Sequence, residues 1–191
     1  MNGQKPKTIS IVISVYNEEK ALHEFYREAT PVFEALPWNY ELIFVNDGSA
    51  DASGQILAEL AAVDPRVRVI NFSRNFGHEA AMLAGLDHSS GDGIVCMDAD
   101  LQHPPEKIVE MYRLWQEGYE VVEGVKSSRG KESPVHTFAA SCFYKLIGSA
   151  AGFDMSHASD FKLLDRKAVN VLLNMKEKNA FFRALSSWVG F

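Results

Sequence analysis

Short runs of β-branched and apolar residues recur along the first 125 residues, and a helical pattern separates each run from the next. The first run, TISIVISV at 8–15, has the continuous apolar character of a strand that is buried on both faces. Strands of this kind that alternate with helices form a parallel sheet with helices on both faces. The pattern therefore predicts an α/β fold with a mostly parallel sheet. Strands are expected over residues 8–15, 40–46, 67–73, 92–100 and 119–125, and helices over 19–35, 51–63, 78–88 and 105–116.

The composition is that of one ordinary globular domain. The chain has 191 residues, 47% of them hydrophobic, which is long enough to bury a core. The net charge of -6 excludes a nucleic-acid binder held by bulk positive charge. Cys96 and Cys142 lie in apolar or helical patterns, so buried free thiols in a reducing compartment are expected. Without a signal-peptide pattern or a run of ~18 apolar residues, the chain as given is expected to be soluble and cytosolic.

Polar segments follow four of the predicted strands, at the point where each strand ends. They read SVYNEE, VNDGSAD, FSRNFGHE and MDADLQ. Taken singly, each is explained by a turn or a helix cap, as for Asn17 or Asp51. The carboxyl ends of parallel strands meet at one rim, however, and open α/β sheets bind ligands there. Four such segments on one rim predict a ligand site.

Asp98 and Asp100 are the most informative pair on this rim. They follow the apolar run 94–97, and strand alternation would place both carboxylates on one side with Ala99 facing away. Two carboxylates so placed repel each other unless a cation lies beside them. Mg²⁺ and Mn²⁺ prefer carboxylate oxygens, and Mg²⁺ typically combines one or two carboxylates with substrate phosphates. The alternative, a pair of solvated surface acids, fits poorly with a fully apolar strand, so the pair predicts a metal–diphosphate site.

Several stretches together resemble one enzyme family. They are SVYNEE, FVNDGSADAS, FSRNFGHEAAMLAGL, MDADLQHPPE and ASDFKLLDRKAV. They are similar to the GT-A-fold inverting glycosyltransferases (family 2) of the dolichyl-phosphate mannose synthase type, and most of all to bacterial polyprenyl-phosphate (bactoprenol) glucosyltransferases. The similarity covers about residues 8 to 191. It implies a single catalytic domain over 1–191, with a nucleotide-sugar-binding half at 8–125 and an acceptor-side half at 126–191.

The resemblance also implies roles for individual residues. The nucleotide-sugar would be bound by Val15, Tyr16, Glu18, Asp47, Gly48, Arg74, Asn75, Asp98 and Ala99. Asp100 and Gln102 would hold Mg²⁺ or Mn²⁺ on the diphosphate. The catalytic set would be Asp160, which matches the family's proposed base, with Asp98 and Arg129. The acceptor phosphate would meet three basic residues, Lys126, Arg129 and Arg183.

Two of these positions leave alternatives open. A lipid monophosphate is already a nucleophile near neutral pH, so Asp160 can orient it or take up its last proton rather than act as a strong base. Asp160 can equally be a helix N-cap, or a structural partner for Arg129 or Lys162. His103 stands where the family commonly has Asp or Asn, and we interpret that position as a turn or cap.

The second half of the chain carries two further ambiguous segments. The loop 125–134 is basic and glycine-bearing, which suits either a solvated flexible loop or contact with an incoming phosphate. The segment 135–153 is apolar and aromatic, which suits either a core helix or an interfacial helix near a lipid acceptor. Because the chain stops on FFRALSSWVGF, whereas members of the family usually continue into membrane helices, we expect a catalytic domain cut off before them.

Together these observations predict a metal-dependent, inverting hexosyltransferase. The expected donor is a UDP- or GDP-hexose, with UDP-glucose favoured by the resemblance. The expected acceptor is polyprenyl (undecaprenyl) phosphate at the membrane surface, on the cytoplasmic face of the inner (plasma) membrane, and a homo-oligomer is compatible with the family. One alternative is a related GT-A transferase acting on a saccharide or other non-lipid acceptor. Another is a non-catalytic nucleotide-binding α/β module, which would not need polar motifs at so many successive strand ends.

Overall fold

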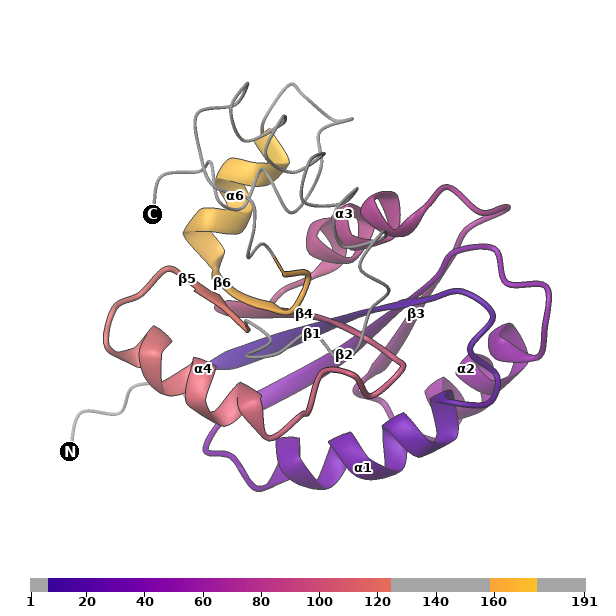
Figure 1. Cartoon of the computed structure of the whole chain (residues 1–191), viewed down its shortest axis with the longest axis horizontal. Helices are drawn as coiled ribbons and strands as arrows, with labels where there is room; N and C mark the ends of the chain where they lie inside the picture. The colour runs from indigo at the N-terminus through magenta and orange to yellow at the C-terminus, as the bar shows by residue number, and fades with distance from the viewer. Residues whose placement is uncertain (1–6, 125–158, 175–191) are drawn as a thin grey trace, which may run out of the picture.

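The computed structural model of the chain describes residues 7–124 and 159–174 and shows a mixed six-stranded sheet with helices packed on it (Figure 1). The strand order is β3-β2-β1-β4-β6-β5. The strands are β1 (Thr8–Val15), β2 (Asn39–Asn46), β3 (Val67–Asn71), β4 (Gly93–Asp98), β5 (Val121–Glu123) and β6 (Lys162–Asp165). The helices are α1 (Leu22–Glu34), α2 (Ser53–Val63), α3 (His78–His88), α4 (Lys107–Gln116) and α6 (Arg166–Asn174).

Strand β1 lies at the centre of the sheet and pairs in parallel with β2 and β4. The register sets Val15 beside Asn46 and Ser14 beside Asp98, so these three strands end at the same edge. Strand β6 is antiparallel to both of its neighbours, β4 and β5. The expectation of an α/β fold with a mostly parallel sheet and helices on both faces is therefore confirmed.

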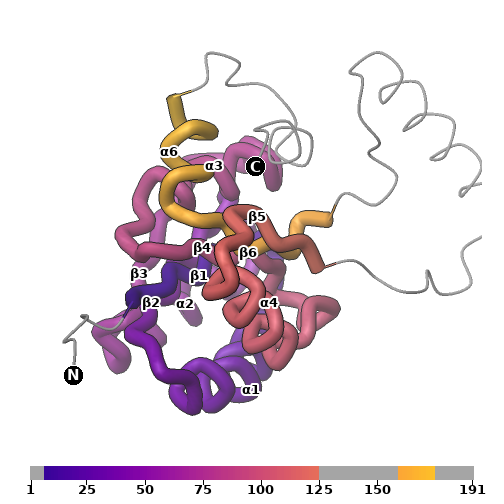
Figure 2. Tube along the Cα trace, turned by 90° about the vertical axis from the view of Figure 1, so that its left-hand side faces the viewer, coloured from indigo at the N-terminus to yellow at the C-terminus, as the bar shows by residue number. Residues whose placement is uncertain are grey.

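Two apolar cores hold the helices against the sheet, one on each face. Phe25, Leu57 and Trp115 belong to the first core, which lies under α1, α2 and α4. Met82 and Val169 belong to the second, under α3 and α6. The same layering is visible when the molecule is turned by 90° (Figure 2). Because successive side chains of a buried strand point to opposite faces, β1 supplies both cores at once.

The boundaries of several elements differ from the sequence prediction. The first helix begins at Leu22 and not at residue 19, and β4 ends at Asp98 rather than at residue 100. Asp51 is not the N-cap residue of α2, a position held by Ala52; the Asp51 carboxylate instead accepts hydrogen bonds from the backbone N–H groups of Ser53 and Glu19. Such short-range side-chain bonds compete with regular helix starts. Strand β6 was not predicted from the sequence.

Within residues 7–124 and 159–174, no helix is long and apolar enough to cross a membrane. Cys96 is buried on β4 as a free thiol, as expected, and its burial raises the pKa of the thiol to about 12. Cys142 and the segments 125–134 and 135–153 lie outside the described residues.

Candidate active site

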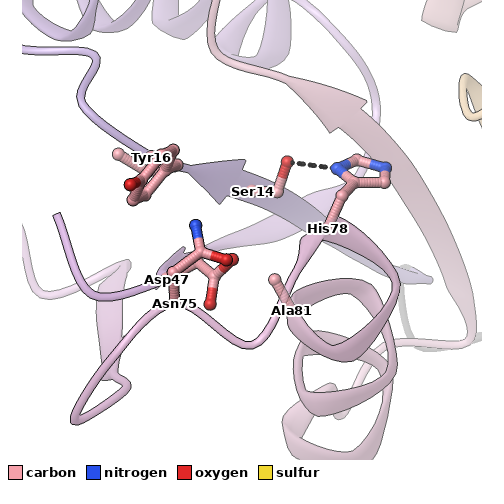
Figure 3. A pocket seen from close by; sticks show the side chains of 7 residues that line it. Ser14, Tyr16, Asp47, Asn75, His78 and Ala81 are labelled. Atoms are coloured by element: carbon pink, nitrogen blue, oxygen red, sulfur yellow. Dashed lines mark hydrogen bonds between the residues drawn. The ribbon is translucent and has the colours of Figure 1, made fainter.

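The carboxyl ends of β1 and β2 and the start of α3 surround a small pocket. Its volume is about 140 Å³ (Figure 3). The lining residues are Ser14, Val15, Tyr16, Asp47, Asn75, His78 and Ala81. Four of the residues expected to bind a nucleotide-sugar, Val15, Tyr16, Asp47 and Asn75, are therefore brought together. Tyr16 is 50% exposed, so its ring is available to a ligand.

Asp47 fixes the loop that forms one wall of the pocket. It is 3% exposed, and its two carboxylate oxygens accept hydrogen bonds from the backbone N–H groups of Phe76 (2.7 Å) and Gly77 (2.9 Å). Gly48 packs closely against the same loop. Its φ is +66°, and a Cβ at this position would collide with the carbonyl carbon of Arg74. The NDG turn thus has a structural role in shaping the pocket, beside the ligand role that the sequence suggested.

Arg74 is exposed on this loop, and its guanidinium lies 4.8 Å from the centre of the Phe76 ring. Phe76 is itself 50% exposed. A cation stacked on an aromatic face at this distance is held in place without losing its access to solvent. Arg74 is therefore presented at the rim beside the pocket.

The carboxylate of Asp98 lies near three side chains on the same rim. Its Oδ1 accepts a hydrogen bond from the hydroxyl of Ser14 (3.0 Å) and lies 3.6 Å from Nδ1 of His78, while its Oδ2 lies 3.8 Å from Nδ1 of His103. The side chain is still 31% exposed. A carboxylate that is oriented by the hydroxyl of Ser14 yet open to solvent is suited to contact a ligand.

His103 is more than the turn or cap that the sequence suggested. It is buried, its ring stacks on Phe161 with centroids 4.9 Å apart, and Nδ1 accepts a hydrogen bond from the backbone N–H of Asp98 (3.3 Å). It therefore ties the end of β4 to the segment leading into β6. No local pattern in the sequence indicates this contact, because it joins residues far apart in the chain.

Three carboxylates, Glu18, Asp98 and Asp100, face one another across the rim. The pKa of Glu18 is raised, first because the group is partly buried and then because the negative charges of Asp100 and Asp98 lie nearby. Asp100 is exposed in the turn after β4, where Oδ1 accepts a hydrogen bond from the N–H of Gln102 and where Leu101 has a φ of +59°. Ala99 between the two aspartates is buried. Because β4 ends at Asp98, however, Ala99 and Asp100 lie in the turn, and the expected strand alternation through residue 100 is wrong.

The carboxylates on this rim fit a divalent cation that is shared with a substrate. Among the described residues, no three His, Cys, Asp or Glu side chains are grouped so that they hold a metal ion by themselves. Mg²⁺, however, typically takes only one or two protein carboxylates and completes its shell with substrate phosphates and water. The exposed carboxylate of Asp100 and the charge repulsion felt by Glu18 are consistent with a cation of that kind.

Asp160 reaches the same rim from the other half of the chain. It is 5% exposed, and its Oδ2 lies 3.7 Å from Nε2 of His78. Since β6 and not a helix follows it, the alternative that Asp160 is a helix N-cap is wrong. Lys162, fully buried on β6, forms an ion pair with Glu123 at 2.7 Å.

The resemblance implied that the turn 75–78 borders the pocket, and Asn75 and His78 do line it. The contact of Ser14 with Asp98 and the contacts of His78 with Asp98 and Asp160 were not predicted. A signal for Ser14 existed, because a hydroxyl near the end of an otherwise apolar strand calls for a partner. The remaining expected residues, Lys126, Arg129 and Arg183, lie outside the described residues.

Comparison with known proteins defines first the fold and then the family. The structure resembles mannosyl-3-phosphoglycerate synthase from Rubrobacter xylanophilus, with a TM-score of 0.63, 19% identity, and 84% of this chain and 54% of that chain covered. It also resembles glucosyl-3-phosphoglycerate synthase from Mycobacterium tuberculosis, solved with Mn²⁺, UDP-glucose and glycerol 3-phosphate. The TM-score is 0.59 and the identity 22%, with 85% of this chain and 58% of that chain covered. The fold is accordingly that of the GT-A glycosyltransferases.

The chain belongs to glycosyl transferase family 2, whose model matches residues 10–173. It is 49% identical to the uncharacterized glycosyltransferase YkcC of Bacillus subtilis, over 95% of this chain and 57% of that protein. It is 39% identical to the bactoprenol glucosyl transferase of Shigella phage SfV, over 95% of this chain and 60% of that protein. The chain thus spans less than two thirds of the length of these relatives. The resemblance found in the sequence is therefore confirmed at the level of the family.

Proposed function

We propose that this chain transfers a hexose, glucose from UDP-glucose, to polyprenyl phosphate with inversion at the anomeric carbon. The observation that supports the proposal most is the position of the pocket. It is lined by Tyr16, Asp47 and Asn75 at the carboxyl ends of the strands, beside the oriented carboxylate of Asp98. That is where an open α/β sheet binds a nucleotide.

The donor would be bound along the rim from the pocket to the turn after β4. Tyr16 offers an exposed ring for the base, and Asp98 lies where the sugar and ribose would meet the protein. Asp100 and Gln102 would hold Mg²⁺ or Mn²⁺ on the diphosphate. Such a bound cation acts as a Lewis acid that stabilises the charge on the departing diphosphate.

The transfer step needs little proton chemistry. An oxygen of the acceptor phosphate forms a bond to the anomeric carbon from the face opposite the donor diphosphate. The bond from that carbon to the diphosphate oxygen breaks, and its electron pair leaves with the nucleoside diphosphate. Asp160 would orient the acceptor and take up the last proton of a monoanionic phosphate, while Arg129, Lys126 and Arg183 would bind the phosphate through charge-assisted hydrogen bonds.

The choice of a lipid acceptor draws on the relatives that are named bactoprenol glucosyl transferases. It implies that the enzyme acts at the cytoplasmic face of the inner membrane, with residues 8–125 as the donor half and 126–191 as the acceptor half. A homo-oligomer on the membrane belongs to the same proposal.

Calorimetric titration with UDP, UDP-glucose and GDP-mannose, with and without Mn²⁺, tests the donor site in the 191-residue chain. The variants are Asp100→Ala and, as a matched control, Asp87→Ala, whose carboxylate is 69% exposed on α3. We expect UDP and UDP-glucose to bind in the presence of Mn²⁺, and this binding to be lost in Asp100→Ala but kept in Asp87→Ala. Well-folded protein that binds none of the nucleotides at millimolar concentration would refute the transferase site.

Turnover then tests the acceptor. Labelled glucose from UDP-glucose should appear on a short-chain polyprenyl phosphate in detergent, and not on a saccharide offered at the same concentration. Transfer to the saccharide alone would refute the proposed lipid acceptor in favour of a soluble one, but it would not contradict the proposed donor site.

A further inference from the structure

His78 lies between the two aspartates that the proposed reaction uses. It is the first residue of α3, and it follows Gly77, whose φ of +96° turns the chain into the helix. Its Nδ1 lies 2.9 Å from the hydroxyl of Ser14 and 3.6 Å from Oδ1 of Asp98. Its Nε2 lies 3.7 Å from Oδ2 of Asp160. One imidazole therefore spans from the central strands to the segment before β6.

The hydrogen bonds define which ring nitrogen carries the proton. Ser14 donates its hydroxyl hydrogen to Asp98, and a serine hydroxyl has only one hydrogen to give. The oxygen of Ser14 must then accept from Nδ1–H of His78. In the neutral ring this leaves a lone pair on Nε2, on the side of Asp160.

Nε2 of His78 is also a buried polar atom without a hydrogen bond. Within the described part of the chain it has no hydrogen-bond partner, even though Asp160 is close. Buried polar atoms are satisfied in the great majority of cases, and an exception near a reaction centre calls for an explanation. Hydrogen bonds of catalytic groups are often long before the substrate binds and become shorter in the complex. A lone pair that faces a carboxylate is suited to accept a proton when that carboxylate acquires one.

We propose that His78 is a positioning residue that acts through Asp160. The proposal rests on the proposed function, in which Asp160 takes up the last proton of the acceptor phosphate. That proton leaves the phosphate oxygen, binds the Asp160 carboxylate, and is held in a hydrogen bond to Nε2 of His78. Nδ1–H meanwhile keeps the ring attached to Ser14 and, through it, to Asp98, so the acceptor and donor carboxylates stay at a fixed separation.

Two half-mimics of the imidazole test this role. In His78→Asn the side-chain amide reaches about as far as Nδ1 of the histidine, so it can form a hydrogen bond only with Ser14. In His78→Gln the amide oxygen reaches about as far as Nε2, so it can accept a hydrogen bond from protonated Asp160. In the full chain we expect His78→Ala to lower kcat by about 100-fold, the low end of the usual effect of an acid–base group. His78→Gln should recover most of that loss, and His78→Asn should not.

Donor binding separates positioning from packing. His78 also lines the pocket, so the Kd for UDP with Mn²⁺ can rise in all three variants. The rise should stay below about fivefold, far less than the fall in kcat of His78→Ala, because Tyr16, Asp47 and Asn75 remain in place. His23→Ala, an exposed histidine on α1, is the matched control and should change neither quantity. If His78→Ala keeps its kcat, or if Asn and Gln fail equally while UDP binding weakens, the positioning role is wrong.

Histidine NMR provides a readout that does not depend on turnover. In ¹⁵N-labelled protein, the His78 ring signals, assigned from their loss in His78→Gln, should shift in Asp160→Asn while those of His23 and His88 stay unchanged. Unchanged His78 signals would show that His78 and Asp160 do not interact, and would refute the positioning role even in an active enzyme. Wild-type protein that transfers no glucose to any acceptor would instead refute the proposed function.

Discussion

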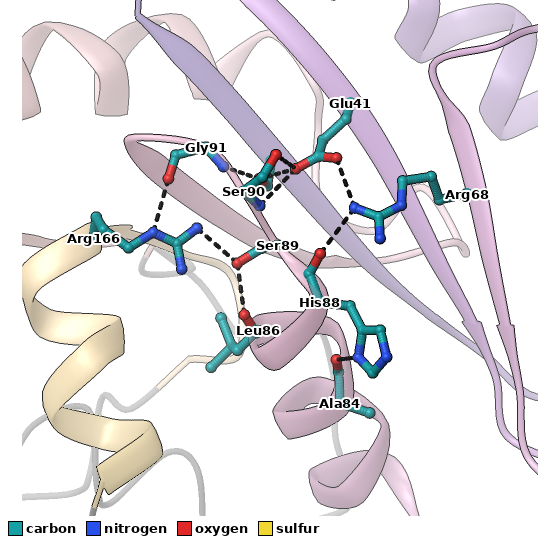
Figure 4. A network of polar contacts seen from close by, with 10 residues as sticks. Glu41, Arg68, Ala84, Leu86, His88, Ser89, Ser90, Gly91 and Arg166 are labelled. Atoms are coloured by element: carbon teal, nitrogen blue, oxygen red, sulfur yellow. Dashed lines mark hydrogen bonds and ion pairs between the residues drawn. The ribbon is translucent and has the colours of Figure 1, made fainter.

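The two ends of the sheet carry polar clusters that are organised in opposite ways. At the amino ends of the strands, hydrogen-bond donors surround the carboxylate of Glu41 (Figure 4). Its Oε1 accepts hydrogen bonds from the hydroxyl of Ser10 (2.6 Å) and from both the N–H and the hydroxyl of Ser90 (2.8 Å each). Its Oε2 forms an ion pair with Arg68 at 3.1 Å. Arg166 closes the cluster on the carbonyl of Gly91. Burial opposes ionisation of Glu41, but these hydrogen bonds outweigh it and lower its pKa.

At the carboxyl ends, acidic groups face other acidic groups. Burial and the charges of Asp100 and Asp98 raise the pKa of Glu18, and Nε2 of His78 is left without a hydrogen bond in the described region. At the amino ends the carboxylate of Glu41 has several hydrogen-bond donors, whereas at the carboxyl ends negative charges lie close together and Nε2 of His78 lacks a donor among the described residues. The difference is consistent with an amino-end cluster that stabilises the fold and with the proposed function, in which a cation binds at the carboxyl-end cluster.

The largest expected effect is on activity, at the carboxyl end. Asp98→Asn keeps an oxygen that accepts from Ser14 but removes the negative charge. We expect transfer activity to fall by at least about 100-fold, as when an electrostatic group is removed from a catalytic site. The melting temperature should stay the same or rise, because repulsion with Glu18 is relieved. A clear loss of stability in thermal unfolding would show that the two ends do not differ as described.

The next effect arises from backbone geometry at the same end. In Gly48→Ala the new residue would have to keep a φ of +66°, and its Cβ would lie 2.6 Å from the backbone nitrogen of Asn75. Left-handed backbone costs a residue with a Cβ roughly 1–2 kcal/mol, and the collision adds to it. We expect a loss of about 3 kcal/mol in urea unfolding together with weaker UDP binding. Unfolding at the wild-type midpoint would contradict the close approach of the two loops.

A smaller effect is expected at the amino end. Glu41→Gln keeps one acceptor oxygen toward Ser10 and Ser90 but turns an N–H₂ group toward Arg68. The lost charge-assisted bond should cost about 2 kcal/mol of unfolding free energy, measured with urea. The kcat of the remaining folded protein should match wild type. A drop in kcat as large as that of Asp98→Asn would show that this cluster also serves the reaction.

The smallest effect concerns pH, and its sign differs between the ends. The folded pKa of Glu41 is lowered, so its contribution to stability is present above the unfolded value of about 4.3 and is lost as the pH falls. The folded pKa of Glu18 is raised, so its contribution is present below that value and is lost as the pH rises. Between pH 6 and pH 3, about the range around that value, Glu41→Gln should flatten the acid loss of stability and Glu18→Gln should steepen it. Shifts of the same sign in both variants would contradict the comparison.

The sequence by itself determined the local features of this protein. Continuous apolar runs such as 8–15 and helical spacing such as 78–88 identified four of the strands and four of the helices to within a few residues, and a fifth strand approximately. Because parallel strands end at one edge, the meeting of the polar segments at one rim also followed from the order of the motifs. The choice of Tyr16, Asp47 and Asn75 within those segments came from the resemblance to the family, and all three line the pocket. These inferences rest on periodicity and connectivity, which a single sequence records directly.

Only the tertiary structure decided the contacts between distant segments. The four residues of β6 are too few to show a period, and their place between β4 and β5 depends on pairing across the sheet. That pairing brings Asp160 next to His78, an encounter between residues 82 positions apart that no local pattern records. The stacking of His103 on Phe161 arises in the same way. Local propensity selects strands and helices, but long-range packing selects which side chains meet at the site.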